Sequence, residues 1–136
     1  MSLKTYHGSC HCGKVKFEAD LDLSKGTGRC NCSYCKKTRN WSSITQPDKF
    51  RLLTSTQEIG EYKFTPESLN KHLFCKTCGV RYATQGFVKE IGGHYVSVVL
   101  ATLDDATPED LLSGPVMYQD GLHNNWQNPP SETKHL

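Results

Sequence analysis

The chain has 136 residues, a length typical of one domain, and 36% of them are hydrophobic. Its formal net charge of +2 is too close to neutral to favour a nucleic-acid-binding protein. The longest apolar run, Val96–Ala101, is far too short to span a bilayer, and Met1–His11 lacks the apolar segment of a signal peptide. We therefore expect one domain over residues 1–136, in the cytoplasm and without contact to a membrane.

Short strands separated by turns are the main prediction for the first hundred residues. Alternating polar and apolar side chains predict a half-buried strand over Lys14–Ala19, and the polar residues and glycines of Asp20–Gly28 predict a loop. Further short strands are expected at Phe50–Thr54, Ile59–Phe64 and Lys71–Phe74, with a turn over Pro66–Asn70. The β-branched and aromatic residues of His94–Leu103 give the strongest strand prediction.

One short helix is expected near the C-terminus. Thr107 is a suitable N-cap and Pro108 a suitable first helical residue, and Gly114-Pro115 ends the helix after about two turns. The polar residues after Asn124 predict an extended tail. The fold class is therefore mainly β, with one or two short helices.

Seven cysteines in three groups are the most informative feature of the sequence. An odd number fits poorly with a closed set of disulfides, and clustered thiols in a reducing compartment favour metal or redox chemistry. The groups are Cys10-His11-Cys12-Gly13, Cys30-Asn31-Cys32-Ser33-Tyr34-Cys35 and Cys75-Lys76-Thr77-Cys78-Gly79.

The spacing of these cysteines predicts two metal sites. Residues i and i+2 of an extended chain face the same way, and a C-x2-C turn brings two thiolates to one ion. The two pairs that are followed by Gly13 and Gly79 supply the four ligands of a structural zinc, namely Cys10, Cys12, Cys75 and Cys78. Cys30, Cys32 and Cys35 remain, and three protein ligands with one open position are typical of a catalytic zinc.

Other interpretations of the three-cysteine group stay open at this point. A fourth ligand could close the site, and the candidates are His11, His72, His94 and His123. A redox C-x2-C is a further alternative, although the βαβ context that would support it is missing.

The cysteine groups and their neighbours resemble the glutathione-dependent formaldehyde-activating enzyme family, which has the Mss4-like fold. The matching segments are Gly8–Gly13 with Val15 and Phe17, Cys30–Cys35, Phe74–Val80, Leu103–Asp105, and Asp120-Gly121 with Asn125-Trp126. The resemblance spans about residues 6–126, which leaves 127–136 as a polar tail. The strand segment Ser97-Val98-Val99, where many members have an asparagine, and the segment Lys36–Trp41 depart from the family pattern.

The resemblance implies a zinc-clamped fold of several twisted antiparallel sheets. It also implies a structural zinc on the four-cysteine group and a catalytic zinc at Cys30, Cys32 and Cys35. The activity that it implies is that of a carbon–sulfur lyase, acting on adducts of glutathione or a related thiol with formaldehyde or another aldehyde. The alternative is a non-catalytic zinc module that binds a protein or nucleic acid, since related folds include such proteins.

Residues next to the three-cysteine group give weaker indications. Lys36, Lys37 and Arg39 could recognise the carboxylates of glutathione, but a solvated basic face is the more common role of such a run. Tyr34 and Trp41 could form a wall of the pocket or belong to ordinary packing. Residues Asp120–Trp126 could close over the site.

Overall fold

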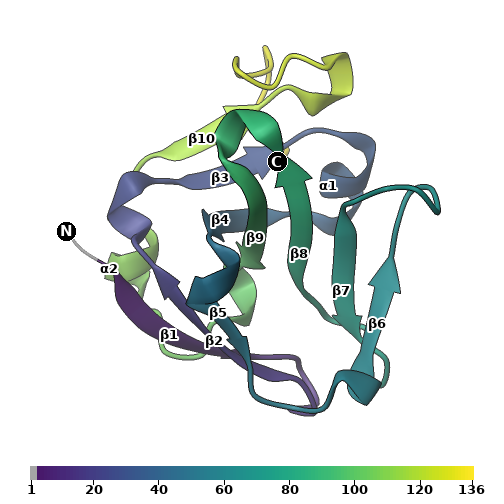
Figure 1. Ribbon diagram of the computed structural model, residues 1–136. Helices are drawn as coiled ribbons and strands as arrows, with labels where there is room; N and C mark the ends of the chain where they lie inside the picture. The colour runs from purple at the N-terminus through teal and green to yellow at the C-terminus, as the bar shows by residue number, and fades with distance from the viewer. Residues whose placement is uncertain (1–2) are drawn as a thin grey trace.

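The computed structural model describes residues 3–136, which form ten β-strands and two short α-helices (Figure 1). The strands are β1 (Lys4–Ser9), β2 (Lys16–Leu21), β3 (Thr27–Cys30), β4 (Trp41–Thr45), β5 (Phe50–Leu52), β6 (Ile59–Tyr62), β7 (Lys71–Cys75), β8 (Arg81–Val88), β9 (Gly93–Val99) and β10 (Val116–Gln119). The helices are α1 (Ser33–Thr38) and α2 (Pro108–Leu111). None of the described helices is long and apolar enough to cross a membrane.

The strands form two sheets, and this confirms the prediction of a mainly β fold with more than one sheet and one or two short helices. The smaller sheet has the antiparallel order β1-β2-β5. The larger sheet has the order β10-β3-β4-β9-β8-β7-β6 and is antiparallel except for β10, which runs parallel to β3. Figure 1 shows β1 and β2 lying across the lower end of the molecule, beside the upright strands β6 to β9.

The core contains side chains from both sheets. Alternation along β2 buries Phe17, Ala19 and Leu21 on one face, as expected for a half-buried strand. The ring of Phe17 stacks on Phe50 of β5 and Tyr82 of β8, with centroid distances of 5.1 and 5.6 Å. These aromatic contacts fix the small sheet against the large one.

The structure differs from the sequence prediction on both sides of the loop expected at Asp20–Gly28. Strand β2 continues to Leu21, a 3-10 helix covers Leu23–Lys25, and β3 begins at Thr27. The polar residues concealed the burial of Leu21 and Leu23, which are 1% and 3% exposed. The sequence also did not predict strands β1, β3, β4, β8 and β10 or helix α1, whose segments carry no clear periodic apolar pattern of their own.

The segment after β9 returns to β1 and is held there by hydrogen bonds. The backbone N–H of Asp104 donates to the carbonyl of His7 (2.7 Å), and the N–H of His7 donates to the carboxylate of Asp105 (2.8 Å). The Nδ1 atom of His7 lies 2.8 Å from the same carboxylate, and its Nε2 atom lies 3.5 Å from Glu18. The hydrogen bond to Asp105 raises the pKa of His7 above its usual value.

Replacing His7 with glutamine should reduce stability in a pH-dependent way. Because the pKa of His7 is raised in the folded protein, its contribution is complete below its unfolded pKa of about 6.5 and is lost as the pH rises through the folded value. The difference in melting temperature between wild type and H7Q should therefore be larger at about pH 6 than at about pH 9. His135→Gln, in the exposed tail, is the control. Equal differences at both pH values would contradict the prediction.

Replacing Gly8 with alanine should destabilise the packing between the sheets. A Cβ atom at this position would overlap the ring of Phe17, which is fixed between two other aromatic rings. We expect G8A to lower the free energy of unfolding by about 1–3 kcal/mol, measured by urea denaturation. Gly28→Ala is a matched control, because the nearest atoms to its new Cβ lie 3.8 and 3.9 Å away. Equal effects of the two substitutions would argue against this packing constraint.

Candidate metal centres

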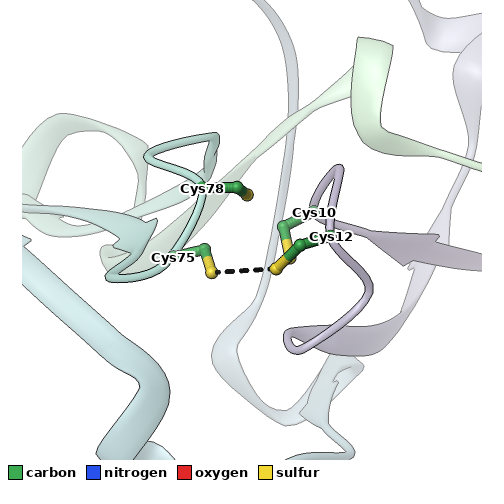
Figure 2. A group of neighbouring side chains, drawn as sticks. All are labelled: Cys10, Cys12, Cys75 and Cys78. Carbon is green, nitrogen blue, oxygen red and sulfur yellow. Dashed lines mark hydrogen bonds between the residues drawn. The ribbon is translucent and has the colours of Figure 1, made fainter.

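Two hairpin turns, one from each sheet, bring four cysteines together. Cys10 and Cys12 lie in the turn between β1 and β2, and Cys75 and Cys78 lie at the turn between β7 and β8. Figure 2 shows the four side chains pointing toward one another from the two turns. The predicted four-cysteine group is therefore assembled in space, with Cys10 and Cys75 buried and Cys12 exposed.

The two turns share the same backbone pattern. In each, the N–H of the first cysteine donates to a valine carbonyl beyond the glycine, from Cys10 to Val15 (3.0 Å) and from Cys75 to Val80 (3.0 Å). The N–H of Val15 also donates to the Cys10 sulfur at 3.3 Å. Both glycines after the pairs have positive φ, 83° at Gly13 and 78° at Gly79, a conformation that favours glycine. The sequence cue of a glycine after each pair thus has a structural cause.

The sulfur positions fit one tetrahedral ion. The four sulfurs lie within 4.8 Å of one another, and the distances from Cys12 to Cys10 and to Cys75 are both 3.6 Å. A tetrahedral zinc with bonds of about 2.3 Å places its sulfur ligands about 3.8 Å apart. A disulfide would need about 2.05 Å, and all seven cysteines are free thiols. The donor set and spacing are therefore consistent with a tetrahedral metal ion such as zinc.

The second group is the three-cysteine cluster of Cys30, Cys32 and Cys35, whose sulfurs also lie within 4.8 Å of one another. Cys30 ends β3, Cys32 is the N-cap of α1, and Cys35 lies in its first turn. The N–H of Cys32 donates to the Cys30 sulfur (3.3 Å), and the N–H of Cys35 donates to the Cys32 sulfur (3.3 Å). These bonds orient the sulfurs and favour the thiolate form.

Hydrogen bonds from the thiols of Cys30 and Cys35, together with the backbone N–H of Cys35, lower the pKa of Cys32. Hydrogen bonding to Cys30 and Cys32, together with burial, raises the pKa of Cys35. Thiolate is the form that binds metal, so Cys32 is set up as a ligand.

Within residues 3–136, no histidine, acidic residue or further cysteine joins the three-cysteine cluster as a fourth ligand. His11 is exposed in the other cluster's turn, and the ring of His94 packs edge-on against Phe87. The Nδ1 atom of His123 lies 2.9 Å from Asp120 instead of at a sulfur. The four-plus-three division of the cysteines is therefore present in the structure.

Aromatic rings and a half-buried guanidinium lie beside the three-cysteine cluster. Tyr34, the residue before Cys35, stacks on His72 with a centroid distance of 3.9 Å, and the guanidinium carbon of Arg81 lies 5.1 Å from the Tyr34 ring centre. Arg81 donates to Asn40 (2.8 Å) and Thr84 (2.6 Å). Sequence analysis missed Arg81, since nothing in its local pattern distinguishes it from a surface arginine.

Burial lowers the pKa of both His72 and Arg81 beside the cluster. Burial and the positive charge of Arg81 lower the pKa of His72 to about 4, so its ring is neutral at pH 7. Burial also lowers the pKa of Arg81, while the nearby tyrosine and cysteine side chains act in the opposite direction. Arg81 stays a cation, because an arginine pKa starts far above neutrality. Arg81 is near enough to Cys32 and Cys35 for a thiolate charge there to raise its pKa, so it can act as a counter-charge for the cluster.

The remaining candidate residues have ordinary surroundings. Lys36, Lys37 and Arg39 are exposed on and after α1, and Arg39 donates only to the carbonyl of His135 among the described residues. Trp41 donates from its indole to Thr27 and packs under Arg29. A solvated basic face and plain packing explain these positions.

The fold and the two clusters define a small mainly β protein with cysteine groups able to hold metal ions. The family model for the glutathione-dependent formaldehyde-activating enzyme matches residues 5–117, and the chain belongs to this family. The crystal structure of a protein from Rhodobacter sphaeroides, solved in structural genomics, is similar, with a TM-score of 0.67 and 28% identity. The match covers 82% of this chain and 99% of that one. The resemblance inferred from the cysteine motifs is confirmed.

Metal analysis of purified protein should find two zinc ions per chain. Cys12→Ser and Cys35→Ser should each remove one ion, and C12S should lower the melting temperature more, because its cluster joins the two sheets. Ser33→Ala, between two ligands of the three-cysteine cluster, should retain both ions and serves as the control. A wild-type protein that holds a single zinc would contradict the division into two sites.

Proposed function

We propose that this protein is a zinc-dependent carbon–sulfur lyase that forms and cleaves adducts between a thiol such as glutathione and formaldehyde or another aldehyde. In this proposal Cys10, Cys12, Cys75 and Cys78 hold a structural zinc, and Cys30, Cys32 and Cys35 hold a catalytic zinc. The observation that carries the proposal is the convergence of three sulfurs without a fourth ligand in residues 3–136. Three protein ligands with an open position are the donor set of catalytic zinc.

Zinc held by three thiolates favours one more soft ligand and would keep a substrate thiol in its thiolate form. The substrate sulfur then forms a bond to the carbonyl carbon of the aldehyde as the carbon–oxygen π bond breaks. The oxygen takes up the proton that the thiol has released, and the product is a hemithioacetal. Cleavage is the reverse of these events, so the same residues serve both directions.

The residues around the cluster support this chemistry by charge and shape. Three thiolates exceed the charge of one divalent ion, and Arg81 supplies a nearby positive charge that offsets the excess. The rings of Tyr34 and His72 stack on each other near Cys35 and Cys32. His72 is neutral at pH 7 and therefore adds no second positive charge beside the cluster.

The family membership supports the choice of substrates, because the family is described as glutathione-dependent and formaldehyde-activating. Lys36 and Lys37 follow Cys35 on the exposed side of α1, where they could meet a carboxylate. Their exposure fits a solvated face equally well, so we assign them no role in the reaction.

Formation of the thiol–aldehyde adduct should be faster with the protein than without it. Exchange NMR of glutathione with formaldehyde measures this rate against the spontaneous reaction, which needs no enzyme. We expect Cys32→Ser to reduce the acceleration more than about 100-fold, because substitutions of residues that only support metal ligands already reduce activity or metal affinity 10–100-fold. Circular dichroism and retention of the other zinc would show that C32S is folded, and Ser33→Ala is the matched control.

A folded C32S variant that accelerates adduct formation as well as wild type would contradict the catalytic role of the three-cysteine cluster. A wild-type protein with two zinc ions and no acceleration for any thiol–aldehyde pair would favour the alternative, a non-catalytic zinc module. In that case a salt-sensitive shift with DNA or RNA in electrophoresis would separate nucleic-acid binding from protein binding.

A further inference from the structure

Asn31 lies between two of the cysteines of the three-cysteine cluster, and its side chain is 5% exposed. Its Nδ2 atom donates to the carboxylate of Asp120 at 2.9 Å, and its Oδ1 atom accepts from the N–H of Leu122 at 3.0 Å. Its backbone N–H donates to the carbonyl of Gln119 at 3.2 Å. The Asn31 side chain thus connects Asp120 and Leu122 to the segment that carries the candidate metal ligands Cys30 and Cys32.

Asp120 closes residues 120–128 into a compact loop, which we call the strap. Its backbone carbonyl accepts from Asn125 (2.9 Å) and its N–H donates to the carbonyl of Asn128 (3.1 Å). Its buried carboxylate accepts from Asn31 and lies 2.9 Å from His123 Nδ1. Asp120 and Leu122 of the strap are therefore both hydrogen-bonded to Asn31, the residue between Cys30 and Cys32.

Gly121 places the strap directly on a sulfur of the cluster. A Cβ atom at this position would lie 2.8 Å from the Cys30 sulfur and 2.5 Å from the ring of Trp126. The backbone of Gly121 has no positive φ, so glycine is needed here for space and not for conformation. Only a hydrogen atom fits between the strap, Trp126 and Cys30.

We propose that the strap is the outer wall of the three-cysteine metal site and slows the release of its ion. Asn31 is a positioning residue: it fixes the strap and, through its own backbone, the two cysteines beside it. Gly121 lets the strap cover Cys30, and Trp126 packs over that contact. Groups outside the ligand set that hold ligands in place typically change metal affinity by 10–100-fold. The inference rests on the proposed function only in requiring that the cluster binds zinc.

The test is the rate at which zinc leaves the protein for a chromogenic chelator. Asn31→Ala removes the anchor, and Gly121→Ala presses a methyl group onto Cys30 and Trp126. In both variants we expect one of the two zinc ions to leave about 10-fold faster or more, while the ion of the four-cysteine group leaves at the wild-type rate. Asn128→Ala is the control, since it removes only an exposed amide contact to Asn125 in the same strap.

Cobalt substitution gives a second readout that loss of general stability would not produce. G121A should change the cobalt–thiolate absorption of one site only, because the new methyl group meets a single sulfur. Wild-type release and wild-type cobalt spectra in both N31A and G121A would overturn the strap proposal while leaving the proposed function intact. A wild-type protein whose three-cysteine cluster takes up no metal would overturn both.

Discussion

Four sulfur atoms connect the two sheets of this protein, and the rest of the structure depends on that connection. The turn between β1 and β2 belongs to the small sheet, the turn between β7 and β8 to the large one, and they meet at their cysteines. Free thiols at this spacing repel once ionised, whereas an ion bound to them would contribute on the order of 10 kcal/mol. With the two sheets held together in this way, the rings of Phe17, Phe50 and Tyr82 can stack between them.

The three-cysteine cluster uses a different construction. It lies where β3 passes directly into α1, so the cysteine spacing and the backbone N–H groups of a strand end and a helix start set the three sulfurs. Cys32 caps the N-terminus of α1, because its sulfur accepts a hydrogen bond from the N–H of Cys35 as a serine or threonine oxygen would. A local segment therefore forms the group, and distant parts of the chain supply only its surroundings.

Those surroundings come from three separate regions. Arg81 and His72 reach the cluster from β8 and β7, and Gly121 reaches it from the strap after β10. Arg81 brings a half-buried positive charge that offsets thiolate charge, and His72 brings a ring that is neutral at pH 7. The parallel pairing of β10 with β3 directs the chain to the strap, because Gln119 lies opposite Cys30.

The sequence by itself determined the four-plus-three division of the cysteines, since spacing and the following glycines depend only on local backbone geometry. It also indicated β2, β9 and α2, whose periodicity or capping residues are local signals. Only the tertiary structure decided that Arg81, Asn31 and Gly121 surround the three-cysteine cluster. Their contacts join residues up to 91 positions apart, as between Asn31 and Leu122, and no local pattern encodes such a pairing.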